Sequence, residues 1–280
     1  MTVEAKSHEL PDEAILARYE QIPARAGAAA NLLRLADDPN TSAQDLARAA
    51  ATDPLFAARL LRVANSTYYG LSGRVSTLPF AVSVVGFQVV RTYAVIAAAG
   101  LDGDDAAPQG FWRAAALCAT AAEQVAPMIG ANPGDAFCVG LLHTLGAALL
   151  HRDHAGEITL CLPEPPDATN LIGHERDTMG VSHDVLAAGV LRSWQFPEHV
   201  VSVVGRHHQQ VLPDAQPLER ALHLARSLAD TLLREDGEDL GEATLSWLSE
   251  GRITPADVPA LLELVTERSA TLLEGLRPRG

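Results

Sequence analysis

The chain has 280 residues, of which 48% are hydrophobic and 20% are charged. This composition is typical of globular proteins and excludes the fibrous and disordered classes, and the length fits one large domain or two closely packed ones. Lys and Arg number 21 against 35 Asp and Glu, which gives a net charge of −14. Because a surface of that sign repels phosphate backbones, we expect no nucleic-acid binding.

The three cysteines, Cys118, Cys138 and Cys161, form no C-x-x-C pair. We interpret them as small buried residues in a reducing compartment. The first ten residues lack the apolar segment of a signal peptide. The longest apolar stretches, such as FCVGLLHTLGAALL, are shorter than the roughly 20 residues that a bilayer requires. The sequence therefore predicts a cytoplasmic protein with no membrane span.

Apolar residues recur at helical spacing along almost the whole chain, and no run alternates as a strand does. The sequence therefore predicts an all-α fold. Asp53-Pro54 precedes a helix LFAARLLRVAN, Asn132-Pro133 precedes one long helix GDAFCVGLLHTLGAALL, and Ser182 precedes a helix HDVLAAGVLRSW. Each start combines a capping side chain with, in the first two cases, a proline at the first helical position.

Segments rich in turn residues separate these helices at Asp38-Pro39, 70–74, 100–110, 162–170 and 236–242. The 100–110 segment is the best internal boundary, between short helices before it and longer helices over about 111–234. Two further amphipathic helices, about 242–250 and 256–275, follow.

An ordered series of features occupies residues 53–91. Asp53-Pro54 starts a helix, Leu60-Leu61 and Ala64-Asn65-Ser66 end it, and Ala81 and Gly86 follow in the next apolar segment. Asn65 and Ser66 favour a helix end because their side chains compete for backbone hydrogen bonds, and Gly86 permits a turn or a close helix approach. Asn65 could also be buried and bridge two helices.

This series resembles the signature of HDOD domains, and the upstream residues fit the opening of that family. The resemblance implies an HDOD domain over 22–212, with an N-terminal half at 22–100 and a second half at 111–212. A lead-in at 1–21 would precede it, and C-terminal helices at 213–280 would pack on the same body.

The second half resembles the HD superfamily of metal-dependent phosphohydrolases, to which HDOD domains are related. The resemblance implies a histidine where this chain has Ala114 and a His-Asp pair where it has His143-Thr144. It also implies a late aspartate where Arg226 stands, and a lysine near Ala147 that is missing. His183 and the pair His207-His208 match histidine positions of some HD relatives.

These losses decide the expected chemistry. A phosphohydrolase metal centre needs carboxylates to hold and bridge its ions, whereas Thr144 offers a neutral hydroxyl and Arg226 a positive charge. We therefore predict no catalytic residue, no metal ligand and no cofactor. A vestigial pocket would contain the remaining candidates, which are Ala114, His143, Thr144, His183, His207, His208 and Arg226.

Alternatives for the histidines stay open. The remaining imidazoles could form a mononuclear zinc site. Otherwise His143 is a buried helix residue bonded to a neighbour, and His207-His208 favours the negative end of a helix dipole. We expect His151, His154 and His174 to face solvent. The acidic pairs Asp37-Asp38, Asp104-Asp105 and Glu235-Asp236 are interpreted as solvated turn residues.

The resemblance implies a non-catalytic bacterial signalling protein that binds other signalling proteins, in a groove between its two halves, or senses a ligand. The alternative is a phosphodiesterase or nucleotide-binding protein with a residual pocket, where Arg113, Arg226 and the histidines hold a phosphate. A helix-turn-helix over 54–99 is disfavoured because the helix LPFAVSVVGFQVV carries no Lys or Arg.

Overall fold

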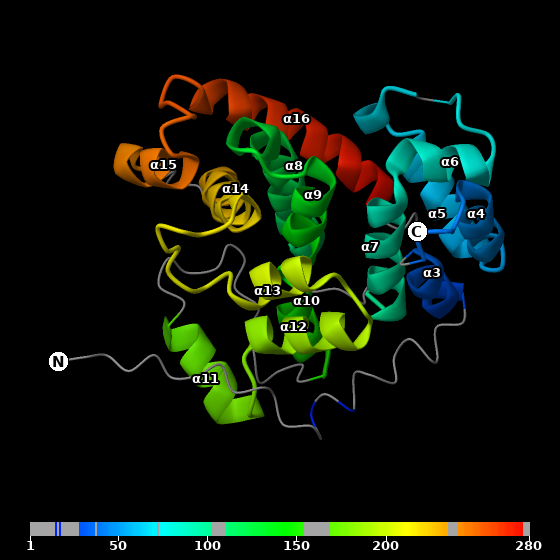
Figure 1. Cartoon of the computed structure of the whole chain (residues 1–280), viewed down its shortest axis with the longest axis horizontal. Coiled ribbons are helices and arrows are strands. Elements are labelled where there is room, and N and C mark those ends of the chain that lie inside the picture. The colour runs from blue at the N-terminus through cyan, green and yellow to red at the C-terminus, as the bar shows by residue number, and fades with distance from the viewer. Residues whose placement is uncertain are drawn as a thin grey trace.

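The structure is a computed structural model, and it describes residues 15, 17, 28–36, 38–71, 73–101, 110–153, 169–234 and 240–276. Every regular element within these ranges is a helix, so the all-α prediction is confirmed. Figure 1 shows the short helices of the first 100 residues gathered on one side of the molecule, while the longer helices occupy the other side.

In the first group of helices, α3 lies against α7, and α6 lies against both α4 and α5. Between α6 and α7 the axis bends by 104°. Gly86 lies at this bend with φ 84°, a backbone conformation that glycine adopts readily. The bounds are α3 (Ala28–Ala36), α4 (Ala43–Ala50), α5 (Pro54–Ala64), η1 (Thr67–Tyr69), α6 (Leu78–Val85) and α7 (Phe87–Ala98).

The ends of α5 are set by the side chains that the sequence singles out. Asp53 Oδ1 accepts a hydrogen bond from the Phe56 N–H at 3.1 Å, which caps the helix start. Asn65 bonds both backbone groups of Val75, since Oδ1 accepts from its N–H at 2.9 Å and Nδ2 donates to its carbonyl at 2.6 Å. Ser66 Oγ donates to the Val63 carbonyl. Asn65 thus ends α5 and ties it to the segment leading into α6.

The second group is built on α8, which packs against α9, α14 and α16. Buried alanines on α8 let its neighbours approach closely, and a Cβ atom built on Gly140 would lie 2.7 Å from the Ala119 Cα. The bounds are α8 (Phe111–Ile129), α9 (Pro133–Leu142), α10 (Leu145–Asp153), α11 (Thr169–Met179), α12 (His183–Ser193), α13 (Glu198–Gly205), α14 (Pro217–Leu233), α15 (Glu242–Ser249) and α16 (Val258–Leu276).

The single helix predicted after Asn132-Pro133 is interrupted by a two-residue turn at His143 and Thr144, which divides it into α9 and α10. The His143 ring bonds the Gly140 carbonyl through Nδ1 at 2.7 Å. In a continuous helix that carbonyl would accept the Thr144 N–H instead. The His143 ring therefore contacts the same carbonyl at the point where the helix is interrupted.

The remaining predictions about histidines, loops, cysteines and acidic residues have different outcomes. His151 is half-buried in the last turn of α10, whereas His174 and Asp38 are exposed as predicted. The loop predicted over 162–170 ends earlier, since α11 begins at Thr169. Cys118 and Cys138 are buried, as predicted. Outside the described residues lie Asp37, Asp104, Asp105, His154, Cys161, Glu235 and Asp236.

α16 connects the two groups of helices, since it contacts α8 on one side and α5 with η1 on the other (Figure 1). Arg268 on α16 places its guanidinium carbon 4.7 Å from the centroid of the Tyr68 ring. The Tyr68 hydroxyl in turn donates to the Glu123 carboxylate on α8. One polar contact network thus joins η1, α8 and α16.

One stretch, Pro133–Asp153, is long and apolar enough to cross a membrane by length and composition. Of its most apolar 18-residue window, 83% is buried inside the fold, as in the core helices of globular proteins. The bent pair α6 and α7 passes the same test only if the two helices are counted as one span.

Candidate functional site

Three histidines from α12 and the end of α13 meet inside the second group of helices. His183 is the first residue of α12, and His207 and His208 lie in the turn that follows α13. The ring centroids are 5.3 Å apart for His183 and His207, 4.8 Å for His183 and His208, and 4.2 Å for His207 and His208. We call these three residues the histidine cluster. Each offers a nitrogen within 4.8 Å of the others.

Glu175 on α11 holds His183 in place. Its carboxylate accepts the His183 backbone N–H at 2.9 Å and the ring Nδ1 at 2.7 Å, and both side chains are buried. Because a carboxylate only accepts hydrogen bonds, the Nδ1 of His183 carries the proton and its Nε2 carries the lone pair. Ser182 was expected to cap α12, yet its side chain makes no cap bond and Glu175 performs this role.

Two more histidines also make their hydrogen bond through Nδ1. His143 bonds the Gly140 carbonyl through Nδ1 at 2.7 Å, and His207 bonds the Val204 carbonyl through Nδ1 at 2.6 Å. A carbonyl also only accepts, so in both rings Nε2 is the nitrogen with the lone pair. The rings of His143 and His207 are 5.7 Å apart, which places His143 beside the histidine cluster.

The close approach of α10 to α12 positions His183. A Cβ atom built on Gly146 would lie 1.9 Å from the His183 carbonyl oxygen, so only a glycine fits there. Thr144, two residues earlier, is fully buried, and its Oγ1 has no hydrogen-bond partner among the described residues. The aspartate position implied by the resemblance is therefore occupied by a buried neutral hydroxyl.

Arg226 on α14 lies next to the histidine cluster, since its guanidinium donates to the His207 carbonyl. Ala114 is buried on α8. Arg113 donates to the Leu232 carbonyl at 3.4 Å, about 9 Å along α14 from Arg226 at 1.5 Å per residue. These two contacts place the guanidinium groups of Arg113 and Arg226 at different points along α14.

The dinuclear metal centre implied by the HD resemblance does not fit these donors. Among the residues that the structure describes, no carboxylate joins the histidine cluster. Glu175 faces His183 Nδ1 and the backbone, on the side of the ring away from Nε2. Two hard or borderline ions need bridging carboxylate, and this cluster supplies imidazoles only.

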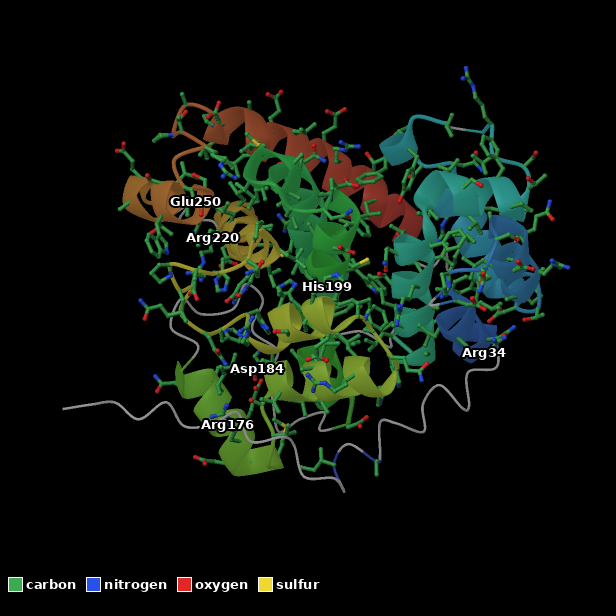
Figure 2. All side chains as sticks on the ribbon, in the orientation of Figure 1. Arg34, Arg176, Asp184, His199, Arg220 and Glu250 are labelled. Carbon is green, nitrogen blue, oxygen red and sulfur yellow. The ribbon has the colours of Figure 1, made fainter. Side chains whose placement is uncertain are left out.

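Two residues near the cluster were not found from the sequence. Asp184 follows His183, is 2% exposed, and its Oδ1 has no hydrogen-bond partner among the described residues; Figure 2 shows it on the side of α12 that faces α11. His223 on α14 is half-buried, and burial with the nearby charge of Arg226 lowers its pKa to about 4. Neither shows a sequence signal beyond its place beside His183 or near Arg226.

The fold and these histidine positions define a helical domain related to the HD phosphohydrolases. The sequence profile of the HDOD domain matches residues 22–210, and the chain belongs to the HDOD domain family.

Similar proteins agree on the fold. An uncharacterized protein from Treponema pallidum (strain Nichols) is 26% identical over 228 residues, which cover 79% of this chain but 44% of that protein. This chain therefore spans less than half of that relative. A candidate phosphohydrolase from Shewanella amazonensis SB2B has a TM-score of 0.67 at 23% identity, covering 96% of this chain and all of the other.

A candidate signal transduction protein from Marinobacter aquaeolei VT8 has a TM-score of 0.58 at 23% identity, over 88% of this chain and 58% of that one. An HDOD domain protein of unknown function from Geobacter sulfurreducens has a TM-score of 0.55 at 20% identity, over 94% of this chain and 92% of that one. At these identities the structural likeness shows a shared fold.

Proposed function

We propose that this protein is a non-catalytic regulatory module of bacterial signal transduction, which acts by binding other signalling proteins. The observation that carries the proposal is the donor set at the former metal centre. Thr144 and Arg226 stand where carboxylates are implied, and Ala114 stands where a histidine is implied. The buried hydroxyl of Thr144 and the guanidinium of Arg226 at the His207 carbonyl cannot hold or bridge a hydrolytic metal pair.

The signalling role is supported by family membership and by the fold shared with a candidate signal transduction protein. A domain that has lost its reaction can still serve as a rigid scaffold for partner recognition, because function resides in sites placed on a fold. Partner binding is therefore the activity that the family and the changed donors together favour.

A hydrolysis assay tests the catalytic half of this proposal. The purified protein is incubated with Mn²⁺, Fe²⁺ or Mg²⁺ and with bis-p-nitrophenyl phosphate or a cyclic dinucleotide. We expect the same background rate for the wild type and for His143→Ala. Turnover that His143→Ala abolishes would make the protein an enzyme and overturn the proposal.

A binding assay tests the other half. A protein that cross-links to this chain in its native host is identified and purified separately. It is then titrated into this protein, and binding is measured by isothermal titration calorimetry. We expect a stoichiometric complex with a signalling protein. If cyclic dinucleotides instead raise the melting temperature while no protein binds, the nucleotide-binding alternative replaces this proposal, because a ligand that binds only the folded state stabilises it.

A further inference from the structure

We propose that the histidine cluster of His183, His207 and His208 binds a single zinc-class divalent ion that ties the start of α12 to the end of α13. The ion has a structural or regulatory role here, and in that respect the inference rests on the proposed function. A dinuclear hydrolytic centre uses carboxylates, whereas this site consists of imidazoles alone.

The protonation states of the rings favour metal binding. His183 and His207 each carry the proton on Nδ1, because Glu175 and the Val204 carbonyl accept from that atom. Metal-ligating histidines usually donate their other ring N–H to a carboxylate or a backbone carbonyl, which fixes the tautomer and the ring orientation. Two of the three rings are therefore already held in the form that coordinates through Nε2.

The distances between the ring nitrogens suit a tetrahedral ion. A Zn–N bond of about 2.0–2.1 Å implies ligand nitrogens about 3.3 Å apart in a tetrahedral site. The Nε2 atoms of His183 and His208 are 2.8 Å apart, and all three ligand atoms fall within 4.8 Å of one another. The close pair is about 0.5 Å shorter than this tetrahedral spacing, and the widest pair is at most about 1.5 Å longer. His208 is half-buried and is the ring with room to move.

A simple hydrogen bond accounts for only part of the cluster. With His183 Nε2 as acceptor, His208 Nε2 must donate, which explains the 2.8 Å pair. The His207 ring is packed against both other rings, and its Nδ1 is held by a carbonyl. A metal ion at this point takes the place of the shared proton and draws on the Nε2 lone pairs of the three rings.

The donor chemistry selects the ion. Imidazole ligands suit Zn²⁺, Cu²⁺ and Ni²⁺, whereas Mg²⁺, Ca²⁺ and Mn²⁺ prefer oxygen ligands. The charges nearby have both signs: Glu175 lies behind His183 and Asp184 follows it, while Arg226 lies at the His207 carbonyl. Arg226 lowers the affinity for a cation, so we expect tighter binding when its charge is removed.

Metal titration of the intact chain tests the site. The protein is stripped with a chelator, and Zn²⁺ binding is measured by calorimetry and Co²⁺ binding by visible absorption. We expect one equivalent of Zn²⁺, and Co²⁺ bands typical of four- or five-coordinate geometry. His208→Ala should abolish both signals, and its unchanged circular dichroism would show that the fold is kept. His199→Ala, a matched loss of an exposed histidine on α13 (Figure 2), should bind as the wild type does.

Glu175→Gln provides a subtler comparison, because the amide oxygen can still accept from Nδ1 but carries no charge. We expect its Zn²⁺ affinity to fall about 10- to 100-fold, the usual effect of altering the residue behind a ligating histidine. Arg226→Gln should raise the affinity. Equal Zn²⁺ binding by the wild type and His208→Ala, or no stoichiometric binding, would overturn the site.

The two proposals fail separately. An absence of Zn²⁺ binding together with an absence of hydrolysis overturns the metal site and leaves the regulatory function standing. Zn²⁺ binding accompanied by phosphodiester turnover supports the site and overturns the non-catalytic function. Zn²⁺ binding without turnover supports both.

Discussion

The guanidinium carbon of Arg91 lies 3.9 Å from the centroid of the Phe196 ring. Arg91 belongs to α7 in the first group of helices and is 1% exposed, while Phe196 lies in the turn between α12 and α13. Arg91 also donates to the Gln195 carbonyl, and Gln195 has a φ of 61°, which is uncommon for a residue other than glycine. A residue from one group of helices therefore holds the turn that joins the two helices of the histidine cluster.

We expect Arg91→Ala to lower the free energy of unfolding by about 3 kcal/mol, since it removes a packed side chain and leaves the Gln195 carbonyl without its donor. Arg91→Lys should cost less but remain destabilising, because an ammonium group cannot lie flat on the Phe196 ring. Urea unfolding measures both. Arg34→Ala, at an exposed position of α3, should change stability by less than about 0.5 kcal/mol. Similar losses for Arg91→Ala and Arg34→Ala would contradict the role of Arg91.

Two helical glycines offer a matched test of the close contact beneath His183. Gly146→Ala would bring a Cβ atom to 1.9 Å from the His183 carbonyl oxygen, so α10 and α12 must separate. We expect a loss of more than about 3 kcal/mol, at the upper end of single-residue effects. Gly173→Ala on α11 meets nothing within 4 Å and should stabilise the protein by about 0.5–1 kcal/mol. Thermal unfolding of both variants measures the contrast, and a mild Gly146→Ala phenotype would contradict the packing.

The two ends of α5 could be predicted from the sequence because they depend on neighbouring residues. Asp53 caps α5 and Asn65 ends it, as their chemistry dictates. A shared pocket for His183, His207 and His208 was also predicted, but from the family resemblance. Helical periodicity shows which face of a helix is buried and not which helix covers it.

Tertiary contacts explain what the sequence could not show. The break at His143 arises where its ring takes a backbone carbonyl, within a segment whose apolar pattern is unbroken. Glu175 looks like any surface acid on a helix until α11 is placed against α12. Arg91 looks like one of many dispersed arginines, and only the fold brings it to Phe196, 105 positions further along the chain.

The pair formed by buried Tyr68 and half-buried Glu123 predicts a pH-dependent stability. Burial raises the pKa of Glu123 above its ordinary value of 4.5, although the Tyr68 hydroxyl and Arg268 work in the other direction. Above pH 4.5 the folded state therefore binds more protons than the unfolded state, so this residue's contribution to stability falls as pH rises toward its folded pKa and stays low beyond it.

The measurement is the difference in unfolding free energy between the wild type and Glu123→Gln across pH 4.5–7. We expect the wild type to lose stability relative to the variant as pH rises. Each unit by which the Glu123 pKa in the folded state exceeds that in the unfolded state contributes about 1.4 kcal/mol to this loss. Tyr68→Phe removes a donor that lowers the Glu123 pKa, so the pH dependence should become steeper. A pH-independent difference for Glu123→Gln would show that the carboxylate is not desolvated.

His223 should make the protein sensitive to acid in the opposite sense. Its pKa falls from 6.5 to about 4, mainly by burial and also by the charge of Arg226, and its Nε2 has no hydrogen-bond partner among the described residues. Between pH 6.5 and about 4 the unfolded state binds a proton that the folded state does not, so stability declines as pH falls through this window.

His223→Leu removes that decline. As pH falls from 8 to 5, the free energy of unfolding of this variant should rise by about 2 kcal/mol relative to that of the wild type. Ser227→Ala, which removes only a contact to the His223 carbonyl, should keep the wild-type slope. Parallel stability curves for the wild type and His223→Leu, measured by urea unfolding, would mean that the imidazole accepts its proton inside the fold and that the space around α14 is more polar than its packing indicates.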